Sequence, residues 1–402
     1  MTNIAILGFG VVGGGVADLI TNNFSQVAKL GGDDIRIKYV LDLRDFPNSP
    51  FADRVIHDFN IILSDEEIDC VIEAMGGSHP AYEYTVAALK AGKSVITSNK
   101  EVVARFGDEF LVLAKENGVC YRFEAAVGGG IPVISPMISC VCQNNIREVR
   151  GILNGTTNYI LTKMFSFGDS FEESLKDAQD KGYAERNPDA DVLGIDACRK
   201  IAILTALVSE KILPTESIHT EGITAIRKED VLNAAKVGLS IKLLGRCVIG
   251  EKGMQVMVAP FMLGNDSPLS SVSGVYNAVE VIGKPIGNVM FYGQGAGAGA
   301  TASAVVGDLM QIMRSGRSYA EPVWTRGTET LCDFADFEAR QYIAICGADK
   351  GAIKKAFGSV QVINNGEELA FITGMISEKN AKKAIEELKK LGATVKSRIR
   401  LI

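Results

Sequence analysis

The feature that most constrains the fold lies at the N-terminus, where an apolar run passes directly into a glycine-rich turn. Residues 3–8 (NIAILG) predict a buried strand, and residues 11–21 predict a helix. Glycines between them permit a tight bend and close approach to a pyrophosphate, and the helix N-terminus offers free N–H groups to an anion. We therefore expect this turn to bind a dinucleotide, a purely structural turn being the alternative. The expected cofactor-binding residues are Gly8, Phe9, Gly10, Val11, Val12 and Gly13.

Strand and helix alternate over the first 125 residues. Further strands are predicted at 35–41, 70–73, 94–97 and 119–125, and helices at 79–91 and 100–117. This alternation is typical of an α/β fold, a parallel sheet with right-handed crossovers. We expect a Rossmann-type dinucleotide-binding domain over residues 1–130, completed by about 293–320, where a glycine-rich stretch opens a helix of small apolar residues.

The rest of the chain follows other patterns. Helical signals dominate 156–210, and strand-like runs at 246–262 and 275–292 indicate an α+β domain over 131–292. Residues 339–402 predict a separate ferredoxin-like unit of βαββαβ order. Its expected elements are 340–346, 350–357, 360–364, 369–375, 378–391 and 393–401.

Composition excludes several classes of function. The chain has 402 residues, a net charge of −6 and no block of lysine or arginine, which argues against nucleic acid or an anionic membrane as a partner. No apolar run approaches the roughly 18 residues of a membrane helix, and no leader precedes the first strand, so we expect a cytoplasmic protein. Eight scattered cysteines without a CxxC pair, and three histidines, give no zinc pattern.

The end of the second strand should distinguish NAD from NADP. Asp42 could accept a hydrogen bond from the ribose 2′-hydroxyl, whereas Arg44 could meet a 2′-phosphate. Either side chain could equally be solvated surface, so the sequence leaves both cofactors open.

The expected helix over 191–209 carries the most informative charged residues. Its second half is apolar nearly all round and should be buried, while Asp196 and Lys200, four residues apart, share one face. A lysine beside a carboxylate near a cofactor is a plausible proton donor and acceptor, because burial lowers its pKa while the carboxylate raises it. An exposed structural ion pair is the alternative.

Three further segments lie where ligands bind such folds. Ser98 and Lys100 follow the strand at 94–97, at the sheet edge that holds ligands in open α/β folds. The glycine-rich turn over 124–132 frees backbone carbonyls that could hold a hard monovalent cation, or could be a plain domain crossover. The stretch 293–299 (GQGAGAG) could approach the nicotinamide, or could be a hinge.

Taken in order, these segments resemble the homoserine dehydrogenase family from Gly8 to about Asp308. The most specific matches are LNGTTNYIL at 153–161, GYAE at 182–185, DVLGIDACRK at 191–200, and GAG at 295–297 before TASAVV at 301–306. The resemblance implies reversible hydride transfer between L-homoserine and L-aspartate 4-semialdehyde with NAD or NADP, a step toward threonine, methionine and isoleucine.

The resemblance also implies roles for individual residues. Lys200 would be the proton donor and acceptor, with Lys100 beside it, and Asp196, Asp191 and Glu185 would hold L-homoserine. Gly182, Gly295 and Gly297 would face the cofactor. The turn that includes Glu124, Val127, Gly129 and Ile131 is similar to the family's sodium-binding turn. Leu41 stands where many relatives carry an arginine for the 2′-phosphate.

Assembly and regulation are further expectations from the resemblance. It points to a homodimer or homotetramer, with residues 131–292 binding substrate and forming the dimer. The tail resembles an ACT domain, an amino-acid-sensing module, so an effector such as threonine could bind there; a structural or dimerising role is the rival. The alternative functions are another amino-acid dehydrogenase on the same scaffold, or a non-catalytic dinucleotide sensor with no use for Asp196 and Lys200.

Overall fold

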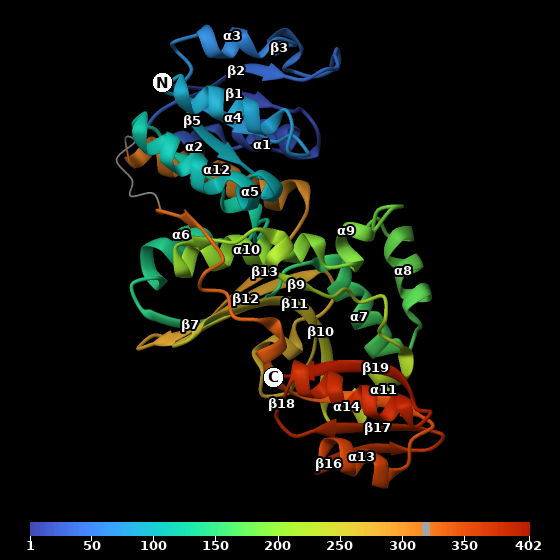
Figure 1. Ribbon diagram of the computed structural model, residues 1–402. Coiled ribbons are helices and arrows are strands. Elements are labelled where there is room, and N and C mark those ends of the chain that lie inside the picture. Colours follow the sequence, from blue (N-terminus) through green and yellow to red (C-terminus); the bar gives the residue numbers. More distant parts are fainter. Residues whose placement is uncertain (316–321) are drawn as a thin grey trace.

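The computed structural model describes residues 1–315 and 322–402. Figure 1 shows the N-terminal unit at one end, the C-terminal tail at the other, and the middle of the chain between them. No helix in these two ranges is long and apolar enough to cross a membrane.

The N-terminal unit is built on a parallel sheet of order β3-β2-β1-β4-β5-β6. Its strands are β1 (Thr2–Leu7), β2 (Ile35–Leu41), β3 (Val55–Ile56), β4 (Cys70–Glu73), β5 (Ser94–Thr97) and β6 (Tyr121–Arg122). Ile4 and Ile6 belong to one apolar core and Ala5 and Leu7 to another. Because both faces are covered, the strands read as continuous apolar runs. The predicted Rossmann-type fold is confirmed.

Five helices of residues 11–116 accompany this sheet, and the three that were predicted differ from the prediction only at their ends. They are α1 (Val11–Asn22), α2 (Phe24–Gly31), α3 (Phe59–Ser64), α4 (Ala81–Lys90) and α5 (Lys100–Glu116). Helices α2 and α3 were not predicted. The expected strand over 119–125 is shorter, because a 3-10 turn, η2 (Glu124–Ala126), begins directly after it.

Helix α12 (Ala298–Ser315) returns to this unit from late in the chain. Val305 and Leu309 pack in the same core as Val16 and Ile20 of α1. Figure 1 shows α12 beside α1 and α2, far in sequence but adjacent in space. Of the segment expected to complete the domain, residues 316–320 lie outside the described residues.

The middle of the chain contributes a mixed sheet. Its strands are β7 (Asn145–Ile152), β9 (His219–Thr220), β10 (Leu239–Gly250), β11 (Gly253–Gly264), β12 (Tyr276–Lys284) and β13 (Gly287–Gln294). The apolar run expected at 246–262 proves to be a hairpin, because a turn at Gly250–Gly253 separates β10 from β11. A separate two-stranded sheet pairs β8 (Lys211–Ile212) with β14 (Thr325–Arg326).

Helices α6 (Ile134–Pro136), α7 (Gly155–Phe167), α8 (Phe171–Asp180), α9 (Asp189–Val192), α10 (Ile195–Ser209) and α11 (Lys228–Lys236) accompany this sheet. Helix α8 starts with the expected capping box of Ser170 and Glu173. The single helix expected over 191–209 is wrong. Gly194 takes a left-handed conformation with φ of 82° and separates α9 from α10, a conformation that favours glycine.

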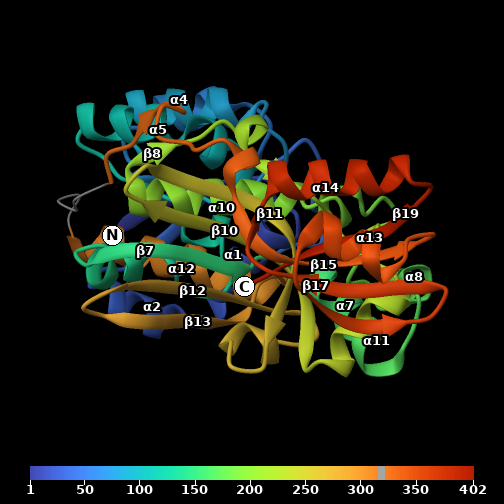
Figure 2. The ribbon, with the colours of Figure 1, turned by 60° about the horizontal axis from the view of Figure 1, so that its bottom comes forward.

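The tail has the predicted βαββαβ order. Its elements are β15 (Glu338–Cys346), α13 (Lys350–Phe357), β16 (Val360–Asn365), β17 (Glu368–Thr373), the short β18 (Ile376–Ser377), α14 (Glu378–Lys390) and β19 (Thr394–Leu401). Strand β19 pairs with β11, so the tail and the middle unit share one continuous sheet of eleven strands. Figure 2 shows the tail strands beside β11, with α14 above them.

Two groups of charged side chains hold the tail against the middle unit, one around the buried Arg400 and one around the partly buried Arg227. Arg400, at the end of β19, is 1% exposed; it donates to both oxygens of Glu221 at 2.8 Å and to Glu378 at 2.7 and 3.1 Å. Arg227, which precedes α11, donates to both oxygens of Glu368 at 2.8 and 2.9 Å. The buried charge of Arg400 is tolerated because it is paired and hydrogen-bonded.

Replacing Arg400 tests this attachment. We expect Arg400→Met to lower the free energy of unfolding by about 3 kcal/mol, because two carboxylates lose their buried partner. Urea unfolding of the full chain measures the change. Arg340→Met, an exposed arginine on β15, is the matched control and should change stability little. Equal stability of the two variants would contradict this account of the tail.

Candidate active site

Three charged side chains meet between the N-terminal unit and the middle unit. Lys200 Nζ lies 2.9 Å from Asp196 Oδ2, and Lys100 Nζ lies 3.0 Å from Asp196 Oδ1. Lys200 and Asp196 come from α10, whereas Lys100 is the first residue of α5, three positions after the last residue of β5. One carboxylate thus bridges two ammonium groups at the carboxyl edge of the parallel sheet.

A backbone carbonyl and an asparagine complete the cluster. Lys200 Nζ donates to the carbonyl oxygen of Leu153 at 2.8 Å. Asn154 Nδ2 donates to Asp191 at 2.7 Å and to Asp196 at 3.0 Å, while its Oδ1 accepts from Thr157 N and caps α7. The chain between β7 and α7 therefore fixes both the lysine and the two aspartates.

Burial and charge set the protonation of this cluster. Burial alone would raise the pKa of Asp196, but the two lysines and the Asn154 hydrogen bond hold it well below the usual range. Burial lowers the pKa of Lys200; the charge of Asp196 opposes this shift, and that of Lys100 adds to it. The pKa of Asp191 is raised by its burial. The cluster therefore combines an ionised carboxylate with an amine that loses its proton more readily than a free lysine does.

The N-terminal turn has the geometry that a pyrophosphate needs. Gly8 takes a φ of 88°, and a Cβ on Gly13 would lie 2.0 Å from the Gly8 carbonyl oxygen, so the bend tolerates no side chain there. Gly10 is the N-cap of α1 and offers no side-chain cap to the first-turn N–H groups, including those of Val11 and Val12. These amides are available to a phosphate, so the turn fits a dinucleotide.

A cleft extends from Gly8 past the end of β2. Asp42 accepts hydrogen bonds from Phe9 N at 2.8 Å and from Arg44 N, Nε and Nη2 at 3.0 to 3.1 Å. The Arg44 guanidinium, against the opposing effect of burial, lowers the pKa of Asp42 to about 2. Asp42 and Arg44, the two rival residues for the ribose end, therefore form one ion pair, and His57 also lines the cleft.

Two glycine-rich segments from distant parts of the chain pack against each other near α1. A Cβ on Gly129 would lie 2.3 Å from the Gly295 carbonyl oxygen, and Gly130 N donates to Gln294 O at 3.2 Å. A Cβ placed on Gly297 would meet no atom within 4 Å, and this glycine takes a φ of 117°. The next residue, Ala298, starts α12, and its carbonyl lies 3.2 Å from a Cβ placed on Gly15 of α1.

The Glu124 carboxylate is already engaged by the backbone. It accepts from Val133 N, Ile134 N and Ser135 N at 2.6 to 2.7 Å, and thereby caps α6. A cation at this turn would therefore have to be bound by backbone carbonyls, as the sequence suggested. Residues 1–315 and 322–402 contain no group of three or more His, Cys, Asp or Glu side chains able to hold a metal.

The remaining predicted residues lie around the cluster without joining it. Ser98 is partly buried between β5 and Lys100. Gly182 and Glu185 lie on the exposed loop between α8 and α9, which Thr156 Oγ1 ties to α7 through a 2.7 Å hydrogen bond to Tyr183 O. No ion pair joins Glu185 to another of the described side chains.

Sequence reasoning missed Asn154 and the Leu153 carbonyl as parts of the site. Both lie in the LNGTTNYIL segment, which was recognised as distinctive but given no role. An asparagine before a helix is commonly an N-cap, so the sequence alone gives no reason to expect a second role for Asn154. Its hydrogen bonds to Asp191 and Asp196 arise only in the folded chain.

Comparisons with known proteins agree with this geometry. The family model described as homoserine dehydrogenase matches residues 132–310, and the one described as its NAD binding domain matches residues 8–124. A homoserine dehydrogenase of Synechocystis sp. is 42% identical over 317 residues, 77% of this chain and 73% of that protein.

Solved structures extend the likeness to the tail. The homoserine dehydrogenase of Thiobacillus denitrificans superimposes with a TM-score of 0.89 at 33% identity, covering 100% of this chain and 98% of that one. A hyperthermophilic archaeal homoserine dehydrogenase mutant, solved with NADPH, has a TM-score of 0.66 at 28% identity and covers 77% of this chain and 97% of that one. Together with the paired lysines at the sheet edge, these matches show that the chain belongs to the homoserine dehydrogenase family.

Proposed function

We propose that Lys200 is the proton donor and acceptor in the reversible conversion of L-homoserine to L-aspartate 4-semialdehyde, with Lys100 at the same oxygen. The chain is an oxidoreductase of the family named for this reaction. One observation supports this assignment most strongly. Both lysines contact Asp196, and they do so at the edge of the sheet where the dinucleotide turn also lies.

The chemistry follows from the charges. A bound nicotinamide dinucleotide supplies the acceptor for the hydride, or its donor in reverse. In oxidation, neutral Lys200 takes the hydroxyl proton of homoserine; in reduction, its ammonium group returns a proton to the forming alkoxide. The lowered pKa of Lys200 makes the neutral form accessible below the usual lysine range, so oxidation should accelerate as pH rises toward that pKa. Asp196 keeps the amine oriented.

The carboxylates around the cluster account for substrate binding. We assign the homoserine ammonium to Glu185, which is exposed on the loop beside α7, with Asp191 and Asp196 on the cluster side. The other dehydrogenase and the non-catalytic sensor named as alternatives have no observation in their favour, whereas the lysine–aspartate cluster and the family matches support the homoserine reaction.

Replacing Lys200 tests the central role. We expect Lys200→Met to lower kcat for homoserine oxidation by about a thousandfold, the scale of general acid–base catalysis, while cofactor binding persists. Absorbance of the reduced cofactor follows turnover. Lys93→Met is the control, because Lys93 is also buried but donates to the Asp65 carbonyl beyond the opposite end of β5. Near-normal turnover of the Lys200 variant would refute the assignment.

The charge at the ribose end favours NAD over NADP. The Asp42 carboxylate is fixed at the end of β2 and would repel a 2′-phosphate, while Arg44, its ion-pair partner, is already neutralised. Leu41 brings no positive charge to this place. We therefore propose that the chain prefers NAD and that Asp42 accepts a ribose hydroxyl.

Changing Asp42 should shift this preference. Asp42→Asn keeps an oxygen that can accept from Phe9 N and releases Arg44, so the ratio of kcat/KM for NADP over NAD should rise about tenfold. Initial rates with both cofactors measure the ratio. Asp45→Asn, an exposed change on the same loop, is the control. An unchanged ratio in the Asp42 variant would contradict the proposal.

A sodium ion at the turn of Glu124, Val127, Gly129 and Ile131 is part of the same proposal. In the described chain, no backbone amide donates to the carbonyl oxygens of Val127, Gly129 or Ile131. Unpaired carbonyls suit a hard cation. Such an ion would brace the contact between this turn and Gly295.

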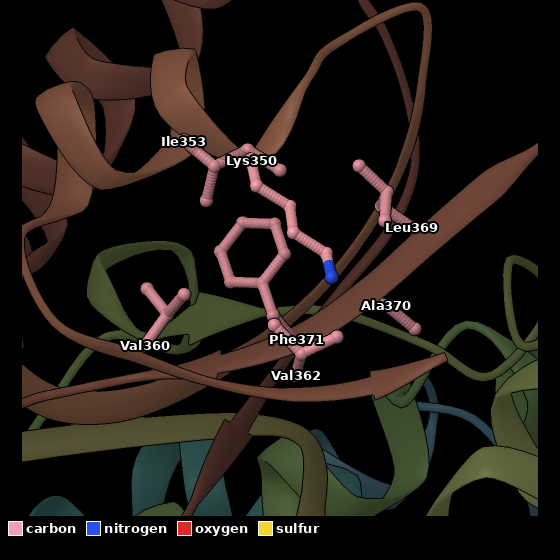
Figure 3. Close-up of a pocket in the computed structure, with 7 residues that line it drawn as sticks. All are labelled: Lys350, Ile353, Val360, Val362, Leu369, Ala370 and Phe371. Carbon is pink, nitrogen blue, oxygen red and sulfur yellow. The ribbon is translucent and has the colours of Figure 1, made fainter. Parts of the chain in front are cut away.

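Assembly and regulation complete the proposal. A homodimer or homotetramer is supported by β13, an edge strand on which Met290 and Tyr292 are exposed. In the ACT-like tail, α13 and the neighbouring strands line a small hollow that is partly open to solvent. Figure 3 shows Lys350 extending over Phe371, with Ile353 and Val360 as further apolar walls. One ammonium group beside apolar walls suits a small amino acid.

An effector titration tests the tail. We expect threonine or isoleucine to raise the melting temperature and inhibit turnover in the wild type, and Lys350→Met to remove both effects because the carboxylate loses its cation. Lys382→Met, an exposed lysine on α14, should behave as wild type. No thermal shift and no inhibition with either amino acid would leave the tail with a structural or dimerising role.

A further inference from the structure

A carboxylic acid with no cationic partner is buried beside the active site. Glu73, the last residue of β4, is 0% exposed and lies between β1 and β5 in the parallel sheet. No lysine, arginine or histidine among the described residues forms an ion pair with it. A buried, unpaired acid is costly, so its presence requires an explanation.

Both carboxylate oxygens of Glu73 are used as acceptors. Thr97 Oγ1 donates to Oε2 at 2.5 Å, and Met75 N donates to Oε1 at 2.7 Å. Thr97 Oγ1 in turn accepts from Asn99 N at 2.9 Å. The acid thus connects the segment after β4 with the segment after β5.

Asn99 continues this network to the active site. Its Oδ1 accepts from Glu101 N and caps α5, and its Nδ2 donates to Gly77 O at 2.7 Å, back on the segment after β4. The next residue, Lys100, reaches Asp196. On the other side, Met75 Cγ lies 3.0 Å from a Cβ placed on Gly8, the first glycine of the dinucleotide turn.

We propose that Glu73 is a positioning residue for the hydride-transfer reaction: through Thr97 and Asn99 it fixes the start of α5, from which Lys100 reaches Asp196, and through Met75 it fixes the segment against the dinucleotide turn. This inference rests on the proposed function and adds a residue to it that touches neither substrate nor cofactor. We assign this role to the ionised form, because both carboxylate oxygens accept the observed hydrogen bonds, whereas a protonated acid would donate from one of them.

Electrostatics make this residue sensitive to pH. Burial raises the pKa of Glu73 to about 7, against the lowering effect of hydrogen bonds from Thr97, Met75 and Asn99. The titratable group that faces it is the Tyr121 phenol of β6; Thr97 and Asn99, which face it from the β5–α5 segment, carry no charge. Because the folded pKa exceeds the usual 4.5, the stability due to Glu73 is complete below pH 4.5 and is lost as pH rises through 7.

Two nearly isosteric variants and one control test the proposal. Glu73→Gln removes the charge, Thr97→Val removes the hydroxyl that relays to Asn99, and Thr85→Val is the control, a buried threonine on α4 whose hydroxyl has no partner among the described residues. We expect kcat for homoserine oxidation to fall about tenfold in the first two and not in the third, with the KM for cofactor changed less than twofold. Wild-type activity should rise between pH 6 and 8 more steeply than that of Glu73→Gln.

The melting temperature of Glu73→Gln is a second readout. If Glu73 had only a structural role, its replacement would lower the melting temperature, whereas a positioning role predicts that it rises. The melting temperature of Glu73→Gln minus that of the wild type should be about 2 °C larger at pH 8 than at pH 5. At pH 8 the wild type buries a charge at this position and the variant does not. A variant that gains stability while it loses turnover has lost a residue kept for function.

The outcomes separate the two proposals. If wild type and Thr85→Val oxidise homoserine and the other two variants match them in kcat and pH profile, the role of Glu73 is refuted and the proposed function stands. If the wild type does not oxidise homoserine with either cofactor, both fail. If Glu73→Gln does not fold, Thr97→Val decides, and wild-type kcat in that variant overturns the proposal.

Discussion

The structure depends on one carboxylate held between two ammonium groups. Asp196 is 5% exposed, and burial of a lone charge there would be unfavourable, so the fold has to bring both Lys200 and Lys100 to it. Lys200 belongs to the middle unit and Lys100 to the dinucleotide-binding unit, and these units also contact each other through α10 and α5. The same three charges therefore join the dinucleotide-binding unit to the middle unit and define where the chemistry occurs.

Each of these side chains is fixed by an ordinary local device. Gly194, in a left-handed conformation, directly precedes α10 and lies two residues before Asp196, and Asn154 caps α7 while it holds both aspartates. Lys100 begins a helix whose cap depends on Asn99 and, through Thr97, on Glu73.

The tail shares a sheet with the middle unit through β11 and β19, and Arg400 binds Glu221 across this boundary. The next residue, Gly222, packs against Val192 of α9. A change in the tail has a short physical route to the cluster.

Local patterns predicted much of this arrangement, because strand runs, the glycine turn and helical periodicity are written in consecutive residues. Such patterns predicted the strands of the first sheet other than β3, the helices α5 and α13, and the pairing of Asp196 with Lys200. The break at Gly194 was missed because glycine is also tolerated inside helices. The contact of Lys100 with Asp196, 96 positions away, was indicated only by family resemblance. In the sequence, Glu73 is only the last residue of an apolar run. The pairing of β4 with β5 is what buries it without a cation and links it to Asn99.

Lys200 is proposed to exchange the proton of the reacting oxygen, and a crystal structure with L-homoserine and the oxidised cofactor would examine this directly. The measured quantity is the distance from Lys200 Nζ to the homoserine hydroxyl oxygen. We predict that this distance is that of a hydrogen bond, about 2.6 to 3.2 Å, with Asp196 still bound to the same amine. A hydroxyl group placed beyond the reach of Lys200 and bound by another side chain would contradict it.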